Sequence, residues 1–273
     1  MQTRDVYLEE YSADAAIARY TSESAGYGIS YLLDHDYAAV YESAVERYLR
    51  VPVHTPLRVL EFGCGGGMNI IKLLTLLERK GRGIERAVGS DFSERLVAAA
   101  TEESRRLLPP RLQEKLRFVV ARNEHLAADL QKELDLPEVE LQGYFHLIVG
   151  VNTFRYSHRL GKELETARDL AALLAAGGIC INIDMNRGFP AFRSKFRDRR
   201  TKPAAERYLP SLQEYAEPFA KAGLEVLRKE NFCWIPHSAG PRLTKVCRLM
   251  APLLNTVAKG RAMRSLVVSR KAA

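Results

Sequence analysis

The residues best suited to chemistry in this 273-residue chain cluster near positions 60 to 91. Glycines stand at 63, 65 and 67, directly after the apolar run 58–62, and Asp91 ends a second apolar run. Glycine permits a sharp backbone turn and lets a ligand approach the main chain closely. An acidic side chain at the tip of the next strand can accept hydrogen bonds from both hydroxyls of a ribose. The pattern therefore predicts a nucleoside-binding site.

The glycine spacing narrows the choice of nucleoside. It reads GxGxG rather than the GxGxxG of dinucleotide sites, and no GxxxxGK[ST] is present, which excludes a P-loop. Glu61, two residues before the first glycine, places a carboxylate beside the turn. A carboxylate repels a pyrophosphate and attracts a cationic or amine-bearing ligand. We therefore include Glu61 among the cofactor-binding candidates.

Two segments resemble the class I S-adenosylmethionine-dependent methyltransferases. They are Val-Leu-Glu-Phe-Gly-Cys-Gly-Gly-Gly at 59–67 and Val-Gly-Ser-Asp-Phe-Ser at 88–93, and the similarity extends more loosely over 55–270. The resemblance implies S-adenosylmethionine as the cofactor and S-adenosylhomocysteine as the product. It also implies a Rossmann-like, doubly wound α/β fold whose seven-stranded sheet is mostly parallel, with the last strand antiparallel.

The same resemblance implies roles for individual residues at the turn. Gly63, Cys64 and Gly65 would run alongside the methionine moiety and the ribose. Asp91 would hold the ribose hydroxyls, and Phe92 would lie against the adenine.

The chain departs from the family pattern after the third strand. Gly-Asp-Ala is frequent there, whereas this sequence reads Ala-Arg-Asn-Glu at 121–124. Asn123 would meet the adenine amine through its side-chain carbonyl, and Glu124 is a second candidate. Asn152, directly after the fourth strand, is expected to contact the cofactor.

The segment 152–158 is expected to face both cofactor and acceptor. His158 is the best-placed general base there, because an unperturbed imidazole titrates near neutrality. Tyr156 and Asp184 are alternatives, and a surface histidine without a catalytic role is the other open interpretation of His158. A sulfonium already activates its methyl group, so alignment and exclusion of water can suffice without any base.

Alternating strands and helices must position these residues. The apolar runs predict strands at 58–62, 87–91, 116–121, 144–151, 179–184, 224–232 and 264–269. Helical spacing predicts helices at 36–49, 68–80, 94–107, 161–175, 211–222 and 243–257, the last with its apolar stripe in the core. Such alternation indicates a parallel sheet covered on both faces. We assign 1–54 as an N-terminal helical cap and 55–273 as the cofactor-binding domain, with 186–222 as a substrate-side insertion.

The acceptor site is expected between the cap and that insertion. Tyr20 and Tyr27 are candidate substrate contacts, because aromatic rings with a polar tip suit a cap over a flat ligand. Arg155 and Arg193 are candidates for binding an acidic group. Eight basic residues fall between 187 and 207, and three interpretations stay open: a solvated loop, the wall of an anion pocket, or a surface for nucleic acid or membrane.

Composition limits the remaining function classes. The formal net charge is +8, no apolar run is long enough to span a bilayer, and four scattered cysteines form no CxxC motif. The N-terminus lacks a secretory pattern, so we expect a cytoplasmic protein without a metal, in which a homodimer is compatible with the sequence. We predict methylation of a small-molecule acceptor in secondary metabolism, and the basic residues make an anionic acceptor one of the open interpretations. An RNA or protein acceptor, and a binding protein of the same fold that transfers no methyl group, stay as alternatives.

Overall fold

The computed structural model describes residues 26–190, 192 and 209–272. Tyr20, Arg193, the first 25 residues of the expected N-terminal helical cap and most of the basic segment 187–207 lie outside the described residues. No helix in the described ranges is both long and apolar enough to cross a membrane.

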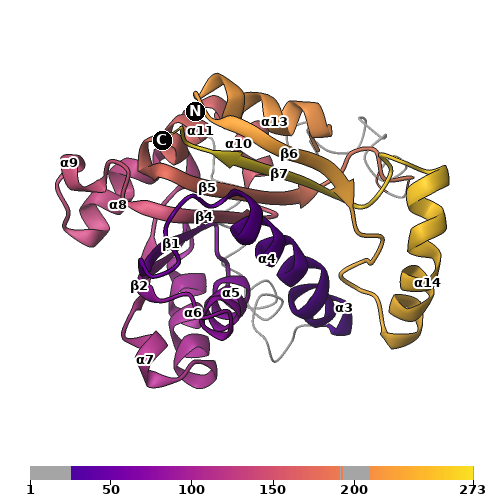
Figure 1. The fold of residues 1–273 in the computed structure, drawn as a ribbon, viewed down its shortest axis with the longest axis horizontal. Helices are drawn as coiled ribbons and strands as arrows, with labels where there is room; N and C mark the ends of the chain where they lie inside the picture. The colour runs from indigo at the N-terminus through magenta and orange to yellow at the C-terminus, as the bar shows by residue number, and fades with distance from the viewer. Residues whose placement is uncertain (1–25, 191, 193–208, 273) are drawn as a thin grey trace, which may run out of the picture.

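Seven strands of the described chain form one sheet in the order β3-β2-β1-β4-β5-β7-β6 (Figure 1). Neighbouring strands are parallel except for β7, which runs antiparallel to both β5 and β6. The strands are β1 (Leu57–Phe62), β2 (Ile84–Asp91), β3 (Leu116–Val120), β4 (Phe145–Val151), β5 (Leu174–Met185), β6 (Glu225–Phe232) and β7 (Arg264–Arg270). The predicted seven-stranded Rossmann-like sheet is confirmed.

Helices cover both faces of this sheet, as a parallel sheet requires. One face carries α4 (Tyr37–Tyr48), α5 (Met68–Arg79), α6 (Glu94–Leu107) and α7 (Pro110–Gln113). The other carries α8 (Leu126–Leu134), α9 (Glu138–Leu141), α10 (Phe154–Leu160), α11 (Glu163–Leu173) and α13 (Leu212–Lys221). Each face has its own apolar core, and ligands of open α/β sheets bind at the carboxyl ends of the strands between these two layers.

The N-terminal part of the described chain is one nearly continuous helical rod. It consists of α3 (Tyr27–Tyr31), a π-helical turn η1 (Leu32–Asp36) and α4, and it lies against α5 and β5 (Figure 1). The glycines at 26 and 28 suggest a loop or hinge, but Gly28 lies inside α3. A Cβ there would come 2.5 Å from the Pro236 carbonyl oxygen, so close packing rather than flexibility explains this glycine.

Helix α14 (Pro241–Val257) corrects another expectation. The apolar stripe of this helix was expected in the core, yet six of its side chains are exposed: Leu243, Val246, Leu249, Met250, Leu253 and Val257. The helix projects beyond the ends of β6 and β7 and continues through Pro252 without a break (Figure 1). Its apolar periodicity predicts an amphipathic helix correctly, but periodicity does not state what the apolar face contacts.

Several elements differ from the sequence-based expectation. Strand β5 begins at Leu174, so the glycines at 177 and 178 lie within this strand rather than ending a helix. Helices α8 and α10 were not expected as separate elements, because both are short and lack a clear start signal. The capping box at Ser211 and Glu214 is present with both of its hydrogen bonds.

Candidate functional site

The glycine turn between β1 and α5 has backbone dihedral angles that are unfavourable for residues with a Cβ atom. Gly63, Gly65 and Gly67 have φ angles of 61°, 54° and 78°, in the left-handed region. A Cβ on Gly63 would lie 1.9 Å from the Thr153 Oγ1 atom, so the close approach of Thr153 also excludes a side chain there. The turn therefore presents bare main chain at the carboxyl edge of the sheet, beside the start of α5.

Asp91 meets this turn directly. Its Oδ2 atom accepts a hydrogen bond from the Gly65 amide at 2.9 Å, and its Oδ1 atom accepts one from the Ser93 amide at 3.0 Å. The side chain is nearly buried, and this burial raises the pKa of Asp91 to about 6, against the lowering effect of the backbone amides. Asp91 is therefore mainly ionised at pH 7 and keeps further lone pairs for ligand hydroxyls.

Glu61 lies behind the turn, at the end of a buried hydrogen-bond chain. The Tyr41 hydroxyl donates to Asn69 Oδ1 at 2.6 Å, and Asn69 Nδ2 donates to Glu61 Oε1 at 2.7 Å. The other carboxyl oxygen of Glu61, Oε2, is buried without a hydrogen-bond partner in the described chain. Burial raises the pKa of Glu61 to about 8, so a nearby cation would be needed to hold it ionised at neutral pH. Sequence reasoning missed Tyr41 and Asn69.

The remaining cofactor candidates surround the turn. Cys64 donates its amide to the Ser90 carbonyl at 2.8 Å, and its thiol is buried with a pKa raised well above the usual value. Asn123 Nδ2 donates to Thr153 Oγ1 at 2.8 Å, which places Asn123 beside the atom that Gly63 accommodates. Phe92 follows Asp91 and is half-buried.

Two polar residues flank this group. Asn152 has a φ of 56° and a buried side-chain oxygen without a hydrogen-bond partner among the described residues. Glu124 lies within 3.9 Å of the Arg122 guanidinium and is half-buried. An unsatisfied buried oxygen at Asn152, beside the bare turn, is a site for a donor from a ligand.

The ends of β4 and β5 bring together Asp184, Arg155 and Tyr156. Asp184 is fully buried and accepts hydrogen bonds from the Arg155 and Met185 amides, both at 2.9 Å. The Arg155 guanidinium lies 3.9 Å from Asp184 and donates to the Tyr156 hydroxyl at 2.8 Å. Burial raises the pKa of Asp184, and the Arg155 charge partly opposes that effect. Arg155 and Tyr156 are thus held together at the carboxyl ends of β4 and β5.

His158 is placed elsewhere. Its ring packs edge-on against Phe154 and Tyr215, with centroids 5.2 and 5.4 Å away, in the apolar layer between α10 and α13. Burial lowers the pKa of His158 to about 4, so the ring is neutral at pH 7. An imidazole is chemically suited to act as a base. The His158 ring, however, lies on the inward face of α10 and packs against aromatic rings. The geometry therefore does not favour His158 as the base.

The structure also assembles a cluster that no sequence spacing indicates. Arg264, at the start of β7, donates from Nε to the Tyr37 hydroxyl at 3.2 Å, and the same hydroxyl lies 3.5 Å from His237 Nε2. Tyr37 lies 200 residues before His237 and 227 residues before Arg264, so no local sequence motif joins them. Tyr27 lies apart from them, half exposed on α3 and stacked on Tyr31.

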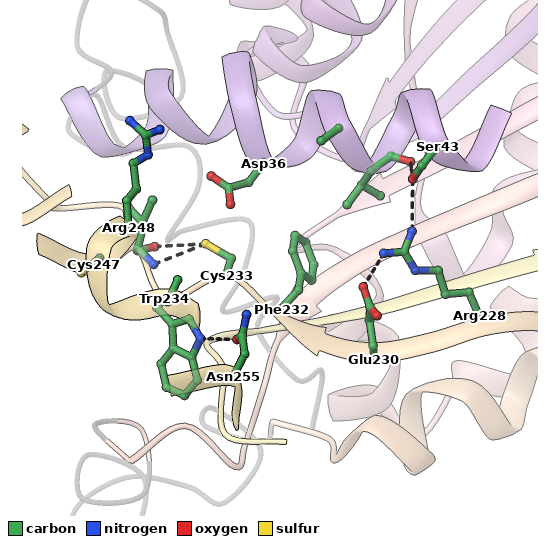
Figure 2. A pocket seen from close by; sticks show the side chains of 14 residues that line it. Asp36, Ser43, Arg228, Glu230, Phe232, Cys233, Trp234, Cys247, Arg248 and Asn255 are labelled. Atoms are coloured by element: carbon green, nitrogen blue, oxygen red, sulfur yellow. Dashed lines mark hydrogen bonds and ion pairs between the residues drawn. The ribbon is translucent and has the colours of Figure 1, made fainter. Parts of the chain in front are cut away.

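A surface cavity of about 310 Å³ opens between α4, β6 and α14 (Figure 2). Asp36 lines it from η1 and Arg248 from α14, and the Trp234 indole donates to Asn255 at 2.7 Å along one side. Arg228 donates to Ser43 at the other end. The cavity is lined by β6 and not by the glycine turn, so it is separate from the Asp91 region. Among the described residues, no group of three or more His, Cys, Asp or Glu side chains could hold a metal ion.

Comparison with known proteins agrees with this geometry. A family model described as "Methyltransferase domain" matches residues 33–229, and no curated protein matches the chain. The C-methyltransferase domain of the citrinin polyketide synthase superposes with a TM-score of 0.59 at 18% identity, covering 94% of this chain and 56% of that one. A putative sarcosine dimethylglycine methyltransferase from Galdieria sulphuraria gives 0.55 at 14% identity, over 88% and 86%.

A third similar structure, the [4+2]-cyclase SpnF, gives a TM-score of 0.54 at 16% identity, over 86% of this chain and 81% of that one. At these identities the likeness establishes the fold, while the family model spans most of the chain. The bare turn, the buried Asp91 carboxylate and the orphaned oxygen of Asn152 fit an adenosyl ligand. The chain belongs to the class I methyltransferase family, whose cofactor is S-adenosylmethionine.

Proposed function

We propose that this protein transfers a methyl group from S-adenosylmethionine to a small-molecule acceptor. The observation that carries the proposal is the contact between Asp91 and the glycine turn, made by the 2.9 Å hydrogen bond from the Gly65 amide. This contact brings a ribose-binding carboxylate and a bare main chain to the same point of the sheet edge.

Each residue around the turn has a defined task in this proposal. Asp91 accepts the ribose hydroxyls, and the bare turn at Gly63 and Gly65 lets the ligand lie against the backbone. Asn123 is positioned by Thr153 to meet the adenine, and Glu61 supplies a buried carboxylate toward an amine. The bound sulfonium supplies an activated methyl group, so the protein has to align the acceptor and exclude water.

The surroundings of the edge support a small acceptor. The rod formed by α3, η1 and α4, together with the loop after β6, packs over the ends of β5 and β7, as the Tyr37–Arg264 and Gly28–Pro236 contacts show. Such covered edges suit an enclosed ligand rather than a long polymer. The similar C-methyltransferase domain of a polyketide synthase is consistent with a secondary-metabolite acceptor. Whether oxygen, nitrogen or carbon receives the methyl group depends on the acceptor.

Calorimetric titration with S-adenosylmethionine and S-adenosylhomocysteine tests the cofactor part of the proposal. We expect both to bind the wild type, and Asp91→Asn to weaken binding by about 1.5–3 kcal/mol, the value of a charge-assisted hydrogen bond. The matched control is Asp135→Asn, at an exposed left-handed position that asparagine accepts readily. A folded wild type that binds neither ligand would remove the proposal.

Product formation tests the transfer itself. Incubation with S-adenosylmethionine and fractions of small-molecule extract should yield S-adenosylhomocysteine, measured by mass spectrometry, and Asp91→Asn should reduce the yield. Binding without any product from small molecules, but with product from RNA or protein, would replace the acceptor class and keep the enzyme.

A further inference from the structure

Arg264 is a fully buried arginine whose charge has no counter-ion in the described chain. Its relative exposure is 0%, its Nε atom donates to the Tyr37 hydroxyl, and its Nη1 atom is buried with no hydrogen-bond partner. No carboxylate of the described residues lies within ion-pair distance of it. Because arginine stays protonated in proteins, a positive charge is held here inside the fold.

A second arginine of the sheet shows how such a group is ordinarily satisfied. Arg58 on β1 donates from Nε to the Tyr144 carbonyl at 2.6 Å, and its other nitrogens lie 3.3 Å from His146 and 3.5 Å from Glu85. Arg58 is also less buried than Arg264. Since burying a charge without a partner costs several kcal/mol, the arrangement around Arg264 is incomplete as it stands.

Asp36 is a carboxylate that acts on Tyr37 and Cys233 in this cluster, but it forms no ion pair with Arg264 in the described chain. His237 hydrogen-bonds with Tyr37, and burial together with the charges of Arg264 and Arg155 lowers the pKa of His237 to about 3. The imidazole is therefore neutral, and two guanidinium groups act on the same small volume. Arg155 has Asp184 as a partner, so the charge that lacks compensation is that of Arg264.

Arg264 also lies at the edge of the sheet where the proposed function expects the acceptor. It is the first residue of β7 and pairs with Met185 at the carboxyl end of β5 and with Phe232 at the carboxyl end of β6. The parallel strands β1 and β4 end at this same edge and carry the glycine turn and Asn152. Phe232, the strand partner of Arg264, also lines the cavity of Figure 2, although Arg264 itself does not.

We propose that Arg264 binds an oxyanion of the acceptor, a carboxylate being the best match to its planar fork. The Tyr37 hydroxyl lies beside the guanidinium and can donate to the same anion, and Arg155 adds a second positive charge nearby. This inference rests on the proposed methyltransferase function where it identifies the bound anion as part of the methyl acceptor. The anion site itself does not depend on the cofactor. The anion anchors one end of the molecule, and the methylated atom lies elsewhere on it.

Thermal unfolding with small probes tests the anion site. Acetate at tens of millimolar should raise the melting temperature of the wild type by a few degrees, because a ligand that binds only the folded state stabilises it. The increase in melting temperature should level off as the acetate concentration rises. Acetamide, which has the same shape without the charge, and sodium chloride at equal ionic strength should not. Equal responses to acetate and acetamide in the wild type would overturn the proposal.

Substitution assigns the response to Arg264. Arg264→Met removes the charge at similar volume; we expect it to lose the acetate response and to melt at or above the wild-type temperature, because an uncompensated buried charge is gone. The matched control Arg58→Met, at an arginine that is already paired, should melt lower and keep the acetate response. An Arg264→Met variant that melts well below the wild type and still responds to acetate would show a structural arginine and overturn the proposal.

Two further measurements keep the test decisive. If Arg264→Met does not fold, Arg264→Lys retains the charge without the fork and should show a weaker acetate response than the wild type; an unchanged response would contradict the proposal. Calorimetry with S-adenosylhomocysteine on the same samples should give affinities within about twofold of the wild type for Arg264→Met. Failure of the wild type to bind S-adenosylhomocysteine would defeat the proposed function, while the contrast between acetate and acetamide would still report on the anion site.

Discussion

Two buried tyrosines one turn apart on α4 reach into two different halves of the site. The Tyr41 hydroxyl begins the chain through Asn69 to Glu61, behind the glycine turn. The Tyr37 hydroxyl meets Arg264 and His237, at the ends of β7 and β6. A single helix thus supports the cofactor half through Tyr41 and the proposed acceptor half through Tyr37.

The two halves differ in the kind of polar group that the described chain leaves unsatisfied. In the cofactor half, both oxygens of Asp91 accept backbone hydrogen bonds, while the buried oxygens Oε2 of Glu61 and Oδ1 of Asn152 lack donors. In the proposed acceptor half, the charged Nη1 atom of Arg264 lacks an acceptor in the described chain. Unsatisfied oxygens suit a ligand that brings hydrogen-bond donors, whereas an unsatisfied cationic donor suits a ligand that brings an anion.

The largest expected effect comes from filling the turn. Gly63→Ala places a Cβ 1.9 Å from Thr153 Oγ1 and forces an L-residue to a φ of 61°. The two costs together are about 3 kcal/mol, which corresponds to a fall in cofactor affinity on the order of a hundredfold. Calorimetry with S-adenosylhomocysteine measures it.

Gly81→Ala is the matched control for that substitution. Gly81 also has a positive φ, of 72°, but nothing lies within 4 Å of a Cβ built there. We expect a loss of stability of about 1 kcal/mol and unchanged cofactor affinity. If both variants bound the cofactor equally well, the close approach of Thr153 to the turn would have no functional meaning.

The next effect is a pH dependence that separates affinity from stability. The pKa of Asp91 is about 6 in the ligand-free protein, so its carboxylate is increasingly protonated below pH 6. Ribose hydroxyls need the ionised acceptor, and cofactor affinity should therefore fall by up to about tenfold per pH unit below pH 6. Titrations between pH 7.5 and 5 measure this, and Asp91→Asn should lose this part of the dependence.

The same pKa acts on stability in the opposite direction. A carboxyl whose pKa is raised on folding contributes most below its unfolded value of about 3.8, and this contribution is lost as the pH rises through about 6. Lowering the pH from 6 to 4 should therefore favour the fold of the wild type, through this group, relative to Asp91→Asn. Denaturant unfolding of both proteins at the two pH values checks the sign; a wild type that gains no relative stability on acidification would place the pKa of Asp91 near its ordinary value.

The glycine turn and Asp91 were predictable because these residues are close in sequence. The glycines at 63–67 and Asp91 belong to one strand–turn–helix–strand unit, and the alternation of strands and helices predicts the parallel sheet around it without giving the strand order. Tyr41 and Asn69 were missed, because no local spacing joins Tyr41 to Asn69 and Glu61. Local hydrogen bonding is equally visible, as the capping box from Ser211 to Glu214 shows. These features depend on spacing alone.

The acceptor half was not predictable, because its contacts join distant segments. Tyr37, His237 and Arg264 meet only after α4, the loop after β6 and β7 have packed together. Burial is also a property of the fold, which is why the imidazole of His158 became a packing group. The exposed stripe of α14 shows the same limit, since periodicity indicates an apolar face without naming its neighbour.

The smallest expected effects come from removing one hydroxyl from each half. Tyr41→Phe leaves Asn69 Oδ1 buried without its donor, at a cost of about 1–2 kcal/mol in stability and a lower cofactor affinity.

Tyr37→Phe removes the hydroxyl that meets Arg264 and should weaken the response to acetate while leaving S-adenosylhomocysteine binding unchanged. Tyr48→Phe, on the last turn of the same helix and without a side-chain hydrogen bond in the described structure, should change stability by less than about 0.5 kcal/mol. If Tyr37→Phe and Tyr41→Phe altered both responses equally, α4 would act as one rigid support, and the division of the site into two halves would be lost.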